Sequence, residues 1–210
     1  MQSRRRARLR IRMRASADCH AKEKSESAIV NRSPTRDHFM ASREYNVLFL
    51  CTSNSARSIM AECAINRWGK GKFRGFSAGS HAKGAIHPTA LALLQELNYD
   101  TSSLRSKSWD EFARADSPPL DFVFTVCDRG AAEQCPLWPG QPITAHWGAT
   151  DPAAFEGSDE EKRRFFFRVY CELENRIKIF TSLRLEALDS FAIEQRVKEI
   201  GKIKLPEGRE

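Results

Sequence analysis

A chain of 210 residues is long enough for one domain with a substantial hydrophobic core. Apolar residues make up 41% of it, and no apolar run approaches membrane-spanning length, which argues against a membrane protein. The net charge of +7 is typical of a nucleic-acid-binding protein, but the first 43 residues hold 12 Lys/Arg and 4 Asp/Glu, whereas the remainder holds 22 and 23. The basic charge therefore belongs to the N-terminal stretch, and we expect no nucleic-acid partner.

Residues 1–43 form a basic N-terminal extension without hydrophobic periodicity, and seven of the first 14 residues are Arg. Mutual repulsion among these charges predicts disorder. An Arg-rich transit peptide, a basic interaction tail and sequence upstream of a start at Met40 all fit this stretch, and we favour the last. Because no apolar signal segment is present in it, we expect a cytoplasmic protein. We expect residues 44–200 to form the folded domain and residues 201–210 to form a C-terminal tail.

Short apolar runs alternate with amphipathic segments from Tyr45 onward. In chain order, the pattern predicts a strand at 46–50, a helix at 59–68, a strand at 73–77, a helix at 88–97, a short helix at 109–115, strands at 121–126 and 143–147, and a helix from 159 to about 188. Pro88 suits the first turn of the second helix, and Ser158 is suited to cap the last. Strands that alternate with helices predict an α/β three-layer sandwich with a four-stranded parallel sheet.

A polar loop between the first strand and the first helix carries the strongest functional signal. Its residues are Cys51, Thr52, Ser53, Asn54, Ser55, Ala56, Arg57 and Ser58. Ligands gather at the carboxyl edge of a parallel sheet, where helix amides and the helix dipole favour an anion. Small residues let the backbone amides curve around it, and Asn54 tolerates the left-handed conformation of a tight curve. Arg57 offers a planar fork for two oxygens of a tetrahedral oxyanion.

The same positive environment acts on Cys51. Loop amides, helix dipole and the Arg57 guanidinium favour its thiolate, so we expect a nucleophile whose sulfur accepts a hydrogen bond from Ser58. Taken alone, Cys51 is more simply interpreted as a small buried residue at the end of a strand. The strand before it, the polar loop and the helix after it favour the functional reading. The cysteines show no metal-ligand spacing, so we expect no metal or cofactor.

A Cys-x5-Arg-Ser motif directly after the first strand resembles the low-molecular-weight tyrosine phosphatase superfamily, which includes thiol-linked arsenate reductases. The resemblance extends from about Tyr45 to the last helix and includes Ser77-Ala78-Gly79 and Asp151-Pro152. It therefore identifies residues 44–200 as a domain of this superfamily. Many members carry a second, protective cysteine before the arginine. This chain has Ala56 there, which leaves the central chemistry intact.

The resemblance implies that Asp151 protonates the departing oxygen, although an ordinary Asp-Pro turn is the alternative. Phosphate and arsenate are near-isosteric, so the loop alone does not distinguish them. Tyrosine phosphatases of the superfamily follow Asp-Pro with tyrosines that flank an aryl ring, whereas this chain has two alanines and Phe155. Cys127 at the end of the third strand and Cys135 beyond it resemble the thioredoxin-linked reductases. The missing tyrosines and the two additional cysteines both favour an arsenate reductase.

For such an enzyme, the resemblance implies that Cys51 attacks arsenate and that Cys127 then releases arsenite by forming a disulfide with Cys51. Cys135 takes over that disulfide, and thioredoxin or glutathione with glutaredoxin reduces it. A route that uses Cys51 and only one further thiol stays open. The alternatives are a low-molecular-weight phosphatase that hydrolyses phosphate monoesters through a cysteinyl-phosphate, and a non-catalytic oxyanion sensor. We expect Cys63 and Cys171 to be core residues.

Overall fold

The computed structural model describes residues 43–127 and 136–204. Its elements are, in order, β1 (Tyr45–Cys51), α1 (Arg57–Trp68), β2 (Phe73–Gly79), α2 (Pro88–Glu96), η1 (Trp109–Glu111), β3 (Phe122–Thr125), β4 (Ile143–His146), η2 (Pro152–Ala154), α4 (Asp159–Thr181), η3 (Leu185–Ala187) and α5 (Ser190–Gly201). Within these residues, no helix combines the length and apolarity needed to cross a membrane. The extension predicted at 1–43 lies, apart from Arg43, outside the described residues.

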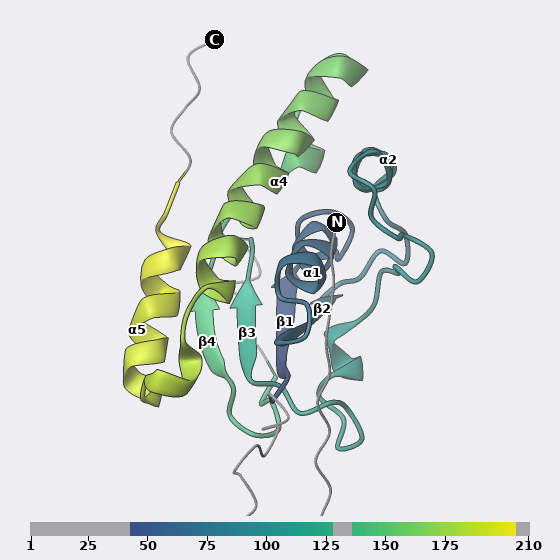
Figure 1. Ribbon diagram of the computed structural model, residues 1–210. Helices are drawn as coiled ribbons and strands as arrows, with labels where there is room; N and C mark the ends of the chain where they lie inside the picture. The colour runs from purple at the N-terminus through teal and green to yellow at the C-terminus, as the bar shows by residue number, and fades with distance from the viewer. Residues whose placement is uncertain (1–42, 128–135, 205–210) are drawn as a thin grey trace, which may run out of the picture. The chain divides into compact units, whose positions relative to one another are not determined.

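The four strands form one parallel sheet in the order β2-β1-β3-β4, as Figure 1 shows. Val47 of β1 pairs with Gly75 of β2 on one side and with Phe122 of β3 on the other. The chain leaves β1 toward β2 and later crosses back to β3, so the carboxyl end of β1 is a topological switch point. Ligands bind at such points in open α/β sheets. The predicted four-stranded parallel sheet is confirmed.

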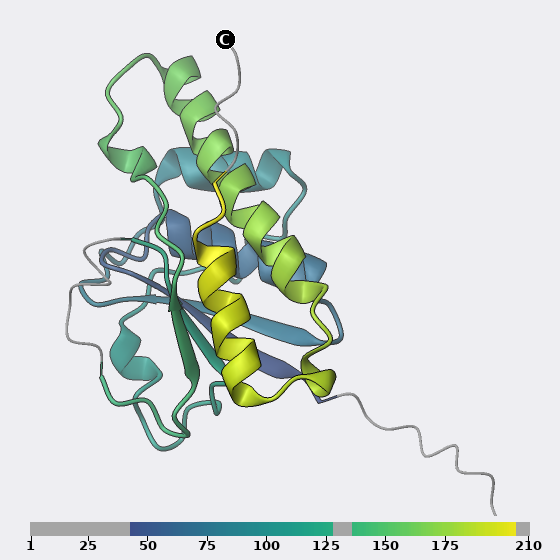
Figure 2. The ribbon, with the colours of Figure 1, turned by 90° about the vertical axis from the view of Figure 1, so that its left-hand side faces the viewer.

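Alternate residues of β1 enter two different hydrophobic clusters. Val47 and Phe49 pack with the buried faces of α1 and α4, whereas Leu48 and Leu50 pack with residues around η1 on the opposite face. Figure 2 shows α1, α4 and α5 on one side of the sheet. Both faces of β1 are therefore covered, which explains why its sequence is a continuous apolar run.

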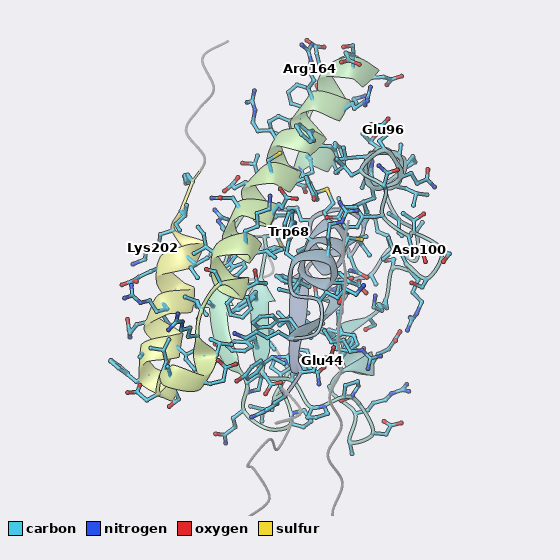
Figure 3. The ribbon with its side chains drawn as sticks, viewed as in Figure 1. Glu44, Trp68, Glu96, Asp100, Arg164 and Lys202 are labelled. Carbon is cyan, nitrogen blue, oxygen red and sulfur yellow. The ribbon has the colours of Figure 1, made fainter. Side chains whose placement is uncertain are left out.

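Two helices, α4 and α2, begin where the capping signals predicted. Ser158 accepts a hydrogen bond from the Glu161 amide and its own amide donates to the Glu161 carboxylate, which forms a capping box at the start of α4. Pro88 occupies the first turn of α2, and His87 before it accepts from the Thr89 amide. Further along, Trp68 at the end of α1 donates to α4 from its indole nitrogen (Figure 3).

Two sequence-based helix predictions are wrong in length. The helix expected to reach residue 188 ends at Thr181, and a separate helix, α5, follows. The Ser182 hydroxyl donates to the Ile179 carbonyl and so competes with the helix backbone, while Asp189 accepts from the Ala192 amide and caps a new helix. The helix expected at 109–115 is the single 3₁₀ turn η1.

Candidate functional site

Cys51 is the last residue of β1, and its side chain is buried at the carboxyl edge of the sheet. The Asn54 amide donates to its sulfur at 3.1 Å, and the Ser58 hydroxyl lies 3.0 Å from the same atom. Since the Ser58 oxygen already accepts from Asn54 Nδ2 at 2.8 Å, its proton is available to the sulfur. Two donors therefore converge on Cys51, and donors of this kind stabilise a thiolate.

Asn54 adopts the left-handed conformation expected for this loop, with φ at 44°. Its buried amide group donates to Ser58 and, at 2.9 Å, to the hydroxyl of Ser77 at the end of β2. Its Oδ1 accepts from the Lys107 backbone amide at 2.7 Å. A single side chain thus connects the loop to α1, to β2 and to the segment before η1.

A buried charge pair lies beneath Asn54. Lys107 Nζ is 3.1 Å from the Glu62 carboxylate and 3.4 Å from the Ser77 hydroxyl, and Ser77 itself donates to Glu62. All three side chains are buried or nearly so. The sequence analysis did not identify this network because its members come from α1, β2 and a loop, and no spacing pattern links them.

The carbonyls of the loop point away from its centre. They accept backbone hydrogen bonds of 2.8–3.3 Å from the segment 80–87, namely from Ser80 to Cys51, from His81 to Thr52, from Lys83 to Ser53 and from His87 to Ser55. Since the carbonyl and amide of one peptide unit point in opposite directions, the loop amides face inward, as an anion site requires. A side chain at Gly79 would approach the Thr52 carbonyl to 2.6 Å, so glycine lets β2 end against the loop.

Arg57 is the first residue of α1, and its side chain is buried beside the loop. Its Nη1 donates to the Ala149 carbonyl at 3.0 Å, and its Nη2 lies 3.0 Å from Asp151 Oδ2. Asp151 follows β4 and accepts from the Ala153 amide through Oδ1 at 3.2 Å. The structure therefore brings Asp151 to the same sheet edge as Cys51, where it pairs with Arg57 at the end of the loop.

None of the residues that directly follow Asp151 places an aromatic side chain beside the site. Ala153 and Ala154 are exposed, and the ring of Phe155 stacks on Phe165 of α4 with centroids 4.7 Å apart. Trp147 is fully buried in the core.

His87 packs behind the loop, with its ring 4.8 Å from that of Phe166. Burial lowers the pKa of His87, and the positive charge of Lys83 lowers it further. The neutral imidazole therefore caps α2 and holds the Ser55 carbonyl through its backbone amide. His87 positions the loop from outside the anion site.

Cys127 lies two residues after the end of β3 and is buried at the same edge. Its sulfur lies 3.7 Å from Oγ1 of Thr52, the neighbour of Cys51. Cys135 lies outside the described residues. Cys63 is a core residue of α1, and burial, together with Glu62, raises its pKa to about 12. Cys171 is only partly buried, and burial raises its pKa as well.

The chain is similar in sequence and fold to known proteins. Residues 46–190 match the family model of low molecular weight phosphotyrosine protein phosphatases. An arsenate reductase of Halalkalibacterium halodurans is 41% identical over 139 residues, which cover 64% of this chain and 93% of that protein. The structure of an arsenate reductase from Archaeoglobus fulgidus has 28% identity and a TM-score of 0.52, with 65% of this chain and 99% of that chain covered. A thioredoxin-dependent arsenate reductase of Corynebacterium glutamicum has 26% identity and a TM-score of 0.50, with 70% and 65% covered.

Proposed function

This chain belongs to the low-molecular-weight phosphotyrosine protein phosphatase family, and within that family we propose that it reduces arsenate to arsenite by thiol chemistry. One observation carries the choice of reaction. A second buried thiol, Cys127, lies 3.7 Å from the side chain of Thr52, next to the nucleophile. Hydrolysis of a phosphate ester needs one thiolate, whereas reduction of arsenate needs two thiols that supply two electrons.

Arsenate first replaces the protein groups that occupy the Arg57 fork. The loop amides and the guanidinium bind its oxygens, and the Asp151 oxygen now paired with Arg57 becomes free to face the substrate. Once its carboxylate is released from Arg57, Asp151 takes up a proton from the solvent. The Cys51 thiolate then attacks arsenic while Asp151 gives that proton to the departing hydroxyl, which leaves as water. The product is a Cys51–arsenic(V) thioester.

Reduction follows in the second step. The Cys127 thiolate attacks the Cys51 sulfur, the sulfur–arsenic bond breaks, and its electron pair remains on arsenic, which goes from As(V) to As(III). Arsenite leaves, and the two sulfurs are oxidised to a Cys51–Cys127 disulfide. Cys135 then attacks Cys127 and returns Cys51 to the thiolate, which leaves a Cys127–Cys135 disulfide for an external dithiol.

We propose a thioredoxin as that reductant, with glutathione and glutaredoxin as the alternative. The thioredoxin-dependent enzyme of Corynebacterium glutamicum, which shares the fold, supports this choice. The alternative of a phosphotyrosine phosphatase is less well supported, because Phe155 stacks on Phe165 and the residues before it are alanines. An aryl ring would therefore find little to pack against beside Asp151.

The test is arsenate-dependent oxidation of NADPH in the presence of thioredoxin and thioredoxin reductase, with glutathione and glutaredoxin in a parallel assay. We expect turnover in the first assay, loss of it in Cys51→Ser and Cys127→Ser, and retention in Cys63→Ser, whose thiol is buried in α1 away from this edge. Mass spectrometry after one turnover without reductant identifies the cysteines that have paired. Rapid hydrolysis of an aryl phosphate that Cys127→Ser leaves unchanged, without arsenate turnover, would establish the phosphatase instead.

A further inference from the structure

The helix α5 extends the chain beyond the part that matches the family. The family match ends at residue 190, where α5 begins, and the helix continues to Gly201. Its buried residues Val197 and Ile200 nevertheless belong to the main hydrophobic core. Figure 1 shows α5 beside α4 on the β4 side of the sheet, and Lys202 marks its end in Figure 3.

Gly201 indicates how closely α5 approaches the sheet. It lies in the last turn of the helix, and a Cβ added there would be 2.2 Å from the His146 carbonyl oxygen and 2.8 Å from Cδ1 of Trp147. Glycine is less favourable than alanine within a helix. Here the close contact with the carboxyl end of β4 explains why glycine is nevertheless present.

Trp147 lies between β3 and α5 and contacts both. Its ring stacks on Phe124 of β3 with centroids 4.1 Å apart, and its Nε1 donates to the Val197 carbonyl of α5 at 2.9 Å. The side chain is fully buried. Removal of the α5 partner would leave a buried indole N–H without its acceptor, which destabilises this packing.

Arg176 of α4 binds the same segment through its backbone. Its buried guanidinium donates from Nη1 to the carbonyls of Trp147 at 2.9 Å and Gly148 at 3.1 Å, and from Nε to the Ile203 carbonyl at 2.9 Å. Nη2 pairs with Glu172. One side chain thus joins α4, the residues after α5 and the segment that follows β4.

That segment leads directly to the candidate active site. Ala149 donates from its amide to the Val126 carbonyl at 3.2 Å, and its own carbonyl accepts from Arg57. Two residues later, Asp151 pairs with the same guanidinium. A displacement of Trp147 would therefore reach both partners of Arg57, which lie two and four residues further along the chain.

We propose that α5 and the residues up to Ile203 act as a clamp that holds residues 147–149, and thereby positions Asp151 against Arg57 and the oxyanion loop. The inference rests on the proposed function insofar as Asp151 is the proton donor. Gly201 of the clamp, Arg176 of α4 and Trp147, which both contact, are positioning residues, because they act on the reacting atoms only through Arg57 and Asp151.

The principal test is Gly201→Ala, which inserts one methyl group between α5 and β4. Since a misplacement of about 1 Å can cost about 100-fold in rate, we expect kcat for arsenate to fall at least about 10-fold, with KM within about twofold of wild type. In an Asp151→Asn background, Gly201→Ala should change kcat by less than about twofold, because the proton donor that it displaces is already absent. A fall by the same factor in both backgrounds would overturn the proposal.

Amide hydrogen exchange supplies a readout that does not depend on arsenate chemistry. We expect the amides of Trp147 and Ala149 to exchange faster in Gly201→Ala than in wild type, and to be unchanged in Gln195→Ala, a matched change at an exposed position of α5. Trp147→Phe removes the indole donor but retains an aromatic ring, and it should give the same exchange pattern if Gly201→Ala does not fold. Unchanged exchange in the folded variants would overturn the clamp. Absence of arsenate turnover in the wild type would overturn the proposed function alone.

Discussion

The guanidinium of Arg57 binds the Ala149 carbonyl and the Asp151 carboxylate at the same time, with both nitrogen–oxygen distances at 3.0 Å. A planar fork suits two oxygens, whether they belong to the protein or to a tetrahedral anion. The proposed substrate therefore competes with Asp151 for Arg57, and binding of the anion and release of the carboxylate become one event.

Arg57→Lys should weaken oxyanion binding, because an ammonium does not bind two oxygens in a fixed plane. We expect KM for arsenate to rise about 10-fold or more, in line with the loss of one charge-assisted hydrogen bond of about 1.5–3 kcal/mol. Protection of Cys51 from iodoacetamide by phosphate or arsenate measures the binding directly. Arg67→Lys, on the last turn of the same helix, is the matched control and should leave protection unchanged.

Asp151→Asn should lower kcat by about 100-fold or more, since general acid catalysis contributes about 10²–10⁴-fold. KM should not rise, because Asp151 competes with the anion for Arg57. Steady-state kinetics with arsenate measure both constants. Asp159→Asn, in the first turn of α4, controls for loss of a carboxylate. An unchanged kcat in Asp151→Asn would exclude Asp151 as the proton donor.

Lys107→Met should destabilise the fold by about 3 kcal/mol, because it leaves the largely buried Glu62 carboxylate without its cation. The double variant Lys107→Met, Glu62→Gln should recover part of that loss, since no uncompensated charge remains. Urea unfolding measures both effects. If the double variant is no more stable than Lys107→Met, the Lys107–Glu62 pair is not the source of the loss.

His87 should make stability depend on pH. Burial lowers the pKa of His87 in the folded chain below its ordinary value of 6.5, so the unfolded chain binds the extra proton first as pH falls. The free energy of unfolding therefore decreases as pH falls below about 6.5 and increases as pH rises toward 7. His87→Asn retains a helix-capping side chain without this titration, and the slope over that range should diminish. His81→Asn, at an exposed position, should keep the wild-type slope.

Alkylation should distinguish the described cysteines. Burial raises the pKa of Cys63 to about 12, so its thiol remains protonated at pH 8 in the folded protein. We expect iodoacetamide to modify Cys51 well before Cys63, as followed by peptide mass spectrometry over time. Addition of urea should remove the difference. Modification of Cys63 at the rate of Cys51 in the folded protein would contradict the assignment of Cys63 to the core.

The sequence alone determined the parts of the site that lie close together along the chain. Cys51, Asn54, Arg57 and Ser58 fall within one loop between a strand and a helix, and their residue types predict the roles that we propose for them. The order of strands and helices, with the loop at the carboxyl edge of β1, was likewise predictable from apolar runs. Strands, helices and the loop between them depend mainly on residues that are close in the sequence, so they can be predicted from sequence patterns.

Only the tertiary structure decided what supports that loop from a distance. Lys107 reaches Glu62 across 45 positions, and Trp147 meets Val197 of α5 across 50. The periodicity beyond Thr181 suggested one long helix, and it did not separate α5 from α4. Contacts of this kind depend on how parallel strands and their crossover helices stack, and many residue types can form them. The sequence therefore contains no local pattern from which they can be predicted.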